Sequence, residues 1–293
     1  MSDTLEHLGR QQRTLTSIRG IVRTMKTLAA INVTPYEQAA SSIEADQRSI
    51  RQGFAAFAFR MGTQGLPALP PAERALLVAF GSDHGFCGNY NAMVARTVAS
   101  APAFSAGKSR PGPQVLCVGA RLHDALIEAG IVPLQRFNPP ASVDGISRLA
   151  GQLVSRIEQL SHDLGLAGLE VMLACTRRAE HGSRVARLDT LLPVAPSLFK
   201  APRRWPGRAL PGFSMAPAPM LSALLRNHIF ASVFRAAAEA LVTENAARLA
   251  LMQQAEQTVE ERLDRLRLQL ASLRQDAITD ELMDIVAGHI EFS

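Results

Sequence analysis

The residues that most suggest chemistry lie in one glycine-rich loop, Gly81–Gly88, which reads GSDHGFCG and follows a short apolar run. A loop between a strand and a helix could hold a phosphate group against backbone N–H groups at the helix N-terminus. The loop matches neither G-x-x-x-x-G-K-[ST] nor G-x-G-x-x-G, so the nucleotide signal is weak. A tight structural turn is the favoured interpretation, and a nucleotide-binding α/β enzyme that uses this loop stays open as an alternative.

Two side chains of the loop, Cys87 and His84, could be imagined as a nucleophile and its general base. Their spacing says nothing about hydrogen-bond geometry, and the sequence shows no third group that would orient them. The remaining cysteines, Cys117 and Cys175, lie far away, so we expect three reduced, packed thiols and no disulfide framework or zinc site. The seven histidines lack the spacing of a metal site. We therefore expect no catalytic residue, no metal and no cofactor.

The charge balance points to an acidic partner. The chain of 293 residues has a net charge of +5. One Trp and two Tyr offer few stacking platforms for nucleic acid, and an acidic protein surface fits the charge equally well. A basic coiled-coil adaptor that binds nucleic acid is a second alternative. No apolar run is long enough to span a bilayer, and the N-terminus lacks the layout of a secretory signal, so we expect a cytosolic chain.

The middle of the chain, residues 72–195, alternates short apolar runs with helical patterns. This alternation predicts an open α/β sheet domain of Rossmann-like type. A turn at His181–Gly182 is expected to join the last two strands. The expected strands are Ala75–Phe80, Gln114–Gly119, Val132–Phe137, Leu169–Thr176 and Ser183–Leu191, and the expected helices are Asn91–Ser100, Arg121–Ala129 and Asp144–Leu164.

The N-terminal segment, residues 1–60, is predicted to be a helix. Pro35 removes a backbone donor, so a kink or short break is expected near Val33–Tyr36. Its apolar residues recur at spacings of three and four, which indicates one buried stripe. The stripe consists of Leu5, Leu8, Leu15, Ile18, Val22, Met25 and Leu28.

The C-terminal segment, residues 219–293, has neither proline nor glycine between Pro219 and Gly288, which predicts one very long helix. Such a helix needs a partner along its apolar stripe, and the N-terminal helix is the other long one available. We therefore expect an antiparallel coiled coil of the two ends, with the α/β domain inserted between them and an extended, Pro/Arg-rich connection at 196–218. The expected seam is Leu249, Met252, Val259, Leu263, Leu266, Leu270 and Leu273.

Three stretches of sequence carry a family resemblance. Thr243–Met252 together with Arg274–Gly288, then Gly81–Asn91, and then Arg23–Ala30 resemble the signatures of the gamma subunit of F-type ATP synthases. The resemblance implies a non-catalytic rotor shaft that couples ion-driven rotation of a membrane ring to ATP synthesis or hydrolysis on surrounding subunits. The implied partners are the alpha and beta subunits of the hexamer, the epsilon subunit and the membrane c-ring, with no nucleic acid. The implied location is peripheral, on the cytoplasmic face of the bacterial inner membrane.

The resemblance also implies which residues contact the partners. One set matches family positions whose side chains hydrogen-bond a loop of the catalytic subunit, and it includes one residue next to those positions. The other set matches the region of the N-terminal helix that faces the acidic lever of that subunit. The first set is Arg248, Gln275 and Thr279 with the neighbour Glu281, and the second is Met25 and Lys26.

Two departures from the family pattern suggest a divergent or alternate F-type enzyme. Ile31–Gln38 has lost basic residues and gained a proline, and His84 stands where the family usually has arginine. Whether the coupled ion is a proton or a sodium ion stays open.

Overall fold

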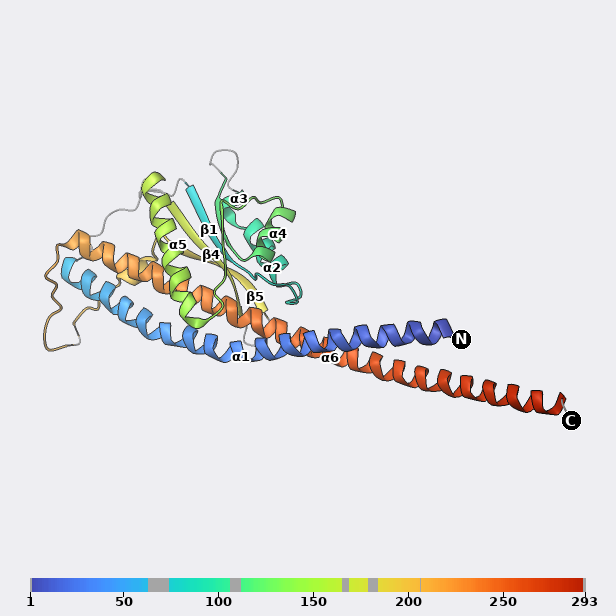
Figure 1. Ribbon diagram of the computed structural model, residues 1–293. Coiled ribbons are helices and arrows are strands. Elements are labelled where there is room, and N and C mark those ends of the chain that lie inside the picture. The colour runs from blue at the N-terminus through green and yellow to red at the C-terminus, as the bar shows by residue number, and fades with distance from the viewer. Residues whose placement is uncertain are drawn as a thin grey trace. The chain divides into compact units, whose positions relative to one another are not determined.

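The computed structural model describes residues 2–62, 74–105, 112–164, 169–178, 184–205 and 207–291 (Figure 1). The contacts of the chain divide it into two compact units. We call Met1–Ala30 with Arg248–Ser293 the helix-pair unit, and Ile31–Ala247 the sheet unit. Two long helices, α1 (Ser2–Met61) and α6 (Pro217–Glu291), contribute to both units.

Helix α1 is continuous through Pro35, so of the two expected alternatives the short break is wrong, and the kink stays a prediction. A proline inside a helix costs about 3 kcal/mol through a lost hydrogen bond and a clash with the preceding turn. Directly after it, Tyr36 and Ala39 are buried in the core of the sheet unit. Burying an aromatic side chain stabilises by about 1.5–3 kcal/mol, so tertiary packing offsets the local penalty.

The sheet unit contains five strands in the order β3-β2-β1-β4-β5. The strands β1 (Arg74–Phe80), β2 (Gln114–Val118), β3 (Gln135–Phe137) and β4 (Leu169–Arg178) are parallel, and β5 (Arg184–Leu192) pairs antiparallel with β4. The predicted open α/β sheet is confirmed. The residues of the predicted turn His181–Gly182 lie outside the described part of the chain.

Helices cover both faces of the sheet (Figure 1). Helices α2 (Tyr90–Ala99) and α4 (Ala120–Glu128) pack on one face, with the short α3 (Pro102–Ser105) following α2. Helix α5 (Val143–Leu164) and parts of α1 and α6 pack on the other face. The β1 strand is buried from Leu76 to Phe80, because it lies in the middle of the sheet between these layers.

Strand β3 is shorter than predicted. The pattern predicted Val132–Phe137, but only Gln135–Phe137 pairs with β2. Pro133 has no N–H to donate, which confines such residues to strand ends and edges. Val132 is 80% exposed. The apolar run therefore ends in a surface loop and leaves a three-residue edge strand.

The described residues between β5 and α6, 193–205 and 207–216, contain one short helix, η3 (Pro196–Phe199), and otherwise have no regular structure. Aromatic contacts join them to the end of α1: Phe54 meets Phe199 with ring centroids 5.2 Å apart, and Phe57 stacks on Phe213 at 5.8 Å. Helix α6 starts at Pro217, two residues before the predicted start. Proline is tolerated in the first turn, where its missing N–H would have had no intrahelical acceptor.

Of the helices in the described ranges, none combines the length and the apolar character that crossing a bilayer requires.

Candidate functional site: the helix pair and its anchors

The helix-pair unit is held by the apolar seam that the sequence predicts on α6. The seam residues are mostly buried, and the two outermost are half-buried. Because each buried aliphatic side chain contributes about 1.5–3 kcal/mol, this seam supplies most of the cohesion of the unit. The buried members are Met252, Val259, Leu263, Leu266 and Leu270, with exposed fractions of 1–8%.

On α1 the predicted stripe is only partly correct. Val22 is buried, but Leu28 is 58% exposed and its neighbour Ala29 is buried instead. The prediction advanced by three residues twice after Val22, and steps of three alone rotate away from a fixed partner because a helix turns once in 3.6 residues. A step of seven from Val22 reaches Ala29 and keeps the seam in register.

Ion pairs cross the seam at one level. Arg23 Nε lies 2.7 Å from Glu256 Oε1, Arg23 Nη2 lies 2.7 Å from Glu260 Oε1, and Lys26 Nζ lies 2.5 Å from Glu256 Oε2. The hydrogen bonds from Lys26 and then Arg23 lower the pKa of Glu256 below its usual value. Lys26, one of the residues predicted to face an acidic partner, is thus already paired within this chain.

The other predicted contact residues differ in how far their side chains are exposed. Met25 is half-buried, and Arg248 is buried with 9% of its surface exposed. Gln275, Thr279 and Glu281 are exposed on α6, and the Thr279 hydroxyl donates to the Gln275 carbonyl at 2.9 Å. The structure therefore brings together the three late residues of α6 on an accessible stretch of helix.

An apolar group beside these polar residues was missed by the sequence reasoning. Ile278, Leu282 and Met283 are 58–65% exposed. Ile278 lies five residues after Leu273, where the predicted heptad seam ends, and Leu282 and Met283 lie four and five residues after Ile278. None of the three falls at the next seam positions, and this mismatch was the available signal. We call Gln275, Ile278, Thr279, Glu281, Leu282 and Met283 the α6 contact stretch.

The glycine-rich loop is a structural junction in the sheet unit. Asn91 Oδ1 accepts from the backbone N–H of Ser82 at 2.9 Å, and Asn91 Nδ2 donates to Ser82 Oγ at 2.8 Å. Asp83 Oδ1 accepts from the backbone N–H of Ala120 at 3.0 Å, at the start of α4. These contacts support the interpretation as a tight turn, because the side chains that could hold a ligand bind the protein's own backbone and side chains.

The cysteines are packed thiols, as predicted. All three are free and buried. Burial raises the pKa of Cys117 and of Cys175 to about 12. The Cys87 thiol lies 3.4 Å from the Ser82 hydroxyl and 3.9 Å from the carbonyl oxygen of His84, so its hydrogen bond to that residue is with the backbone.

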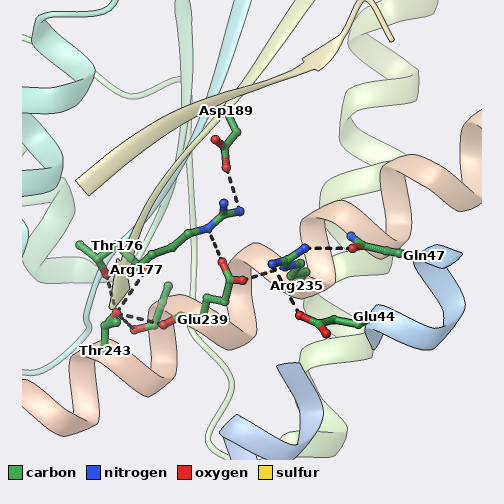
Figure 2. Close-up of polar contacts among 9 residues, drawn as sticks. Glu44, Gln47, Thr176, Arg177, Asp189, Arg235, Glu239 and Thr243 are labelled. Carbon is green, nitrogen blue, oxygen red and sulfur yellow. Dashed lines mark hydrogen bonds and ion pairs between the residues drawn. The ribbon is translucent and has the colours of Figure 1, made fainter. Parts of the chain in front are cut away.

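Helix α6 is attached to the sheet by a polar network that joins four elements, α1, β4, β5 and α6 (Figure 2). Arg177 of β4 hydrogen-bonds Glu239 of α6, and its Nη2 lies 2.8 Å from Asp189 Oδ2 of β5. Glu239 Oε1 also accepts from Arg235 Nε at 2.7 Å, and Arg235 Nη1 donates to Gln47 of α1 at 3.1 Å. Glu239 is thus the shared carboxylate between two guanidinium groups. We call these five residues, with Glu44 at 3.7 Å from Arg235, the Glu239 network.

Two further contacts attach α6 to the sheet unit beside this network. The hydroxyl oxygens of Thr176 on β4 and Thr243 on α6 lie 2.5 Å apart (Figure 2), and both residues are buried. Tyr90 at the start of α2 donates its hydroxyl to the carbonyl oxygen of Ala240 at 2.9 Å. Burial raises the pKa of Tyr90, so this hydroxyl stays protonated and keeps its role as a donor. The part of α6 inside the sheet unit is therefore fixed by side chains of α1, α2 and β4.

Comparison with known proteins identifies this arrangement. The family model described as ATP synthase matches residues 4–290, nearly the whole chain. The chain belongs to the ATP synthase gamma family. The ATP synthase gamma chain of Bdellovibrio bacteriovorus is 28% identical over 223 residues, 74% of this chain and 73% of that one. That of Moorella thermoacetica is 27% identical, and the alignment covers 97% of each chain.

Solved structures show the same fold. The rotor of the Euglena gracilis mitochondrial ATP synthase matches with a TM-score of 0.59 at 15% identity, over 95% of this chain and all of that one. The central stalk and c-ring structure from Tetrahymena thermophila matches with a TM-score of 0.54 at 18% identity, over 80% and 99% of the two chains. As a gamma-family member the chain is a central rotor shaft and a non-catalytic subunit of the synthase.

Proposed function

We propose that this gamma-family shaft couples rotation to catalysis through the α6 contact stretch. The supporting observation is the exposure of Gln275, Thr279 and Glu281 together with Ile278, Leu282 and Met283 on one stretch of helix. Polar groups beside exposed aliphatic side chains suit a surface that a partner covers, because apolar area gains by burial while hydrogen bonds fix the register.

The proposed partners are those that the family resemblance implies. The stretch contacts the alpha and beta subunits of the surrounding hexamer, where Gln275 and Thr279 bond a loop of the catalytic subunit. The sheet unit meets the epsilon subunit and the membrane c-ring. In this arrangement residues 1–60 and 219–293 form the shaft, 72–195 the inserted domain and 196–218 the connection between them. The complex holds the chain peripherally on the cytoplasmic face of the bacterial inner membrane.

Within this proposal Arg248 and Lys26 act differently from the three exposed residues. Lys26 is paired with Glu256, and Arg248 is buried, so both contribute to a partner contact only after rearranging. Met25 is half-buried and offers its thioether to an apolar neighbour. The exposed residues are therefore the first positions to test.

The test compares two double variants in the reconstituted complex. Q275A/T279A removes two proposed hydrogen bonds, and Q253A/T258A removes the same side chains earlier on α6, where Thr258 makes an equivalent hydrogen bond to the backbone of its own helix at 3.0 Å. At about 1 kcal/mol per hydrogen bond, the first variant weakens the contact by about 30-fold.

The measurement is ion transport per ATP hydrolysed, read with both a proton and a sodium indicator. Q275A/T279A lowers this ratio and Q253A/T258A leaves it close to the parent value. Equal ratios in the two variants would overturn the assignment of the stretch, and failure of the chain to assemble with the hexamer subunits would overturn the shaft role itself.

A further inference from the structure

The segment between β5 and α6 carries a cluster of exposed cations. Lys200, Arg203, Arg204 and Arg208 are exposed, and so is Arg60 near the end of α1. Within the part of the chain that the structure describes, none of the five forms an ion pair. The sequence has no Asp or Glu between Asp189 and Glu239 or between Gln47 and Met61. We call these five side chains the basic cluster.

One aromatic contact connects the segment that carries four of these cations with the end of α1, where the fifth lies. The ring of Trp205, which follows Arg203 and Arg204, lies 5.6 Å from the ring of Phe59, the neighbour of Arg60. Gly207 lies against the same indole, since a methyl group added there would be 3.2 Å from Trp205 Nε1. Arg208 follows this glycine directly in the chain, and Arg203 and Arg204 directly precede the tryptophan. Figure 1 shows this segment passing the end of α1 and the start of α6.

Exposed apolar side chains follow the cations in the sequence of the same segment. Leu210 is 67% exposed and Met215 is 50% exposed, while Trp205 is half-buried. A cluster of four or more basic residues with an amphipathic indole and exposed aliphatic groups is the composition that binds a membrane interface. The cations attract anionic headgroups, and the aliphatic side chains enter the boundary between headgroups and acyl chains.

We propose that the basic cluster is a binding surface for anionic phospholipid headgroups. The surface gives the chain a direct contact with the bilayer in addition to the contacts made through partner proteins. Nucleic acid shares the phosphate chemistry but fits less well, because the one nearby tryptophan is packed on Phe59 and Leu210 and Met215 offer no stacking surface.

The test is co-sedimentation of the full chain with vesicles of phosphatidylglycerol and phosphatidylcholine, compared with phosphatidylcholine alone, at several salt concentrations. The chain binds the anionic vesicles, and binding falls as salt screens the charges. R203Q/R204Q/R208Q weakens binding by about 100-fold, because each cation near an anionic surface raises the affinity about fivefold.

The matched control is R13Q/R262Q/R265Q, which removes three exposed arginines from the helix-pair unit and the same net charge. It lowers binding far less than the first triple variant. L210S/M215S keeps every charge and reduces the fraction that stays bound at high salt. Circular dichroism verifies that each variant retains the helical content of the parent.

Several outcomes would overturn the proposal. They are equal binding to both kinds of vesicle, equal losses in the two triple variants, and an oligonucleotide that binds the same cluster more tightly than the vesicles do. Because the assay uses the chain alone, failure here leaves the shaft role untouched. Failure of assembly with the hexamer would in turn leave the vesicle result standing.

Discussion

Replacing Glu239 tests how α6 is attached to the sheet. Glu239 is 17% exposed at its side chain and accepts hydrogen bonds from Arg177 and Arg235, which are 29% and 31% exposed (Figure 2). Glu239→Ala leaves two guanidinium groups near each other without their shared carboxylate. We expect a large loss of stability in the sheet unit, because a half-buried charge that loses its partner must be resolvated or rearranged.

The magnitude follows from the contacts. A hydrogen bond to a charged group contributes about 1.5–3 kcal/mol, so two would give roughly 3–6 kcal/mol. Arg177 keeps Asp189 at 2.8 Å, and Arg235 keeps Gln47 at 3.1 Å. Partial exposure and these remaining partners reduce the effect, and we expect about 2–3 kcal/mol for Glu239→Ala and less for Glu239→Gln, which retains an acceptor oxygen.

Urea unfolding followed by tryptophan fluorescence measures this effect. Trp205 is the single tryptophan of the chain and lies in the sheet unit, so its signal reports that unit. Glu158→Gln is the matched control, because Glu158 forms a surface ion pair with Arg226 at 3.1 Å and such pairs contribute about 0–1 kcal/mol. If Glu239→Ala shifts the unfolding midpoint no more than Glu158→Gln does, the Glu239 network does not stabilise the sheet unit and the reasoning is refuted.

Three further predictions test other parts of the molecule. Gly119→Ala destabilises the sheet unit by about 2 kcal/mol or more, measured by the same unfolding assay, because φ is +103° and the added methyl would lie 2.5 Å from a backbone oxygen; an unchanged midpoint would contradict this. Glu256→Gln lowers the midpoint of unfolding of the helix-pair unit, followed as loss of helicity, more than Glu261→Gln does. Since the pKa of Glu256 is below its usual value of 4.5, its stabilising effect is present above that pH and is lost as pH falls through the lower folded value. Cys117 and Cys175, with pKa values of about 12, resist alkylation at neutral pH in the folded chain and react after unfolding, as mass spectrometry reads out; rapid labelling of the folded chain would show that they are accessible.

The regular elements could be predicted because their signals are local. The run Ala75–Phe80 and the helical pattern of Asp144–Leu164 differ by one residue from the observed starts of β1 and α5. Hydrophobic period determines which residues can be buried, and in this chain the period is clear. The two prolines had different consequences. At Pro35 the helix continues instead of breaking, because burial of the residues after it offsets the local penalty. At Pro133 the edge strand is shorter than predicted.

The contacts that join distant segments could not be predicted. Glu239, Arg177 and Arg235 look like ordinary surface charges in the sequence, because a charge carries no periodic signal of its partner. Lys26 was expected to meet an acidic partner, and the structure pairs it with Glu256, 230 residues later. Register between the two helices decides such pairs, and register depends on the whole seam.

Helix α6 divides its tasks along its length. In the sheet unit it is fixed by Thr243, Glu239 and the carbonyl of Ala240, which bind side chains of two other elements, β4 and α2. In the helix-pair unit its seam is mostly buried, and after Leu273 the apolar side chains of Ile278, Leu282 and Met283 are exposed. A shaft that transmits torque must be stiff where it is driven and accessible where it acts. The fixed segment and the exposed segment lie on one uninterrupted helix. Under the function proposed above, this continuous helix is the covalent and hydrogen-bonded connection through which rotation reaches the α6 contact stretch.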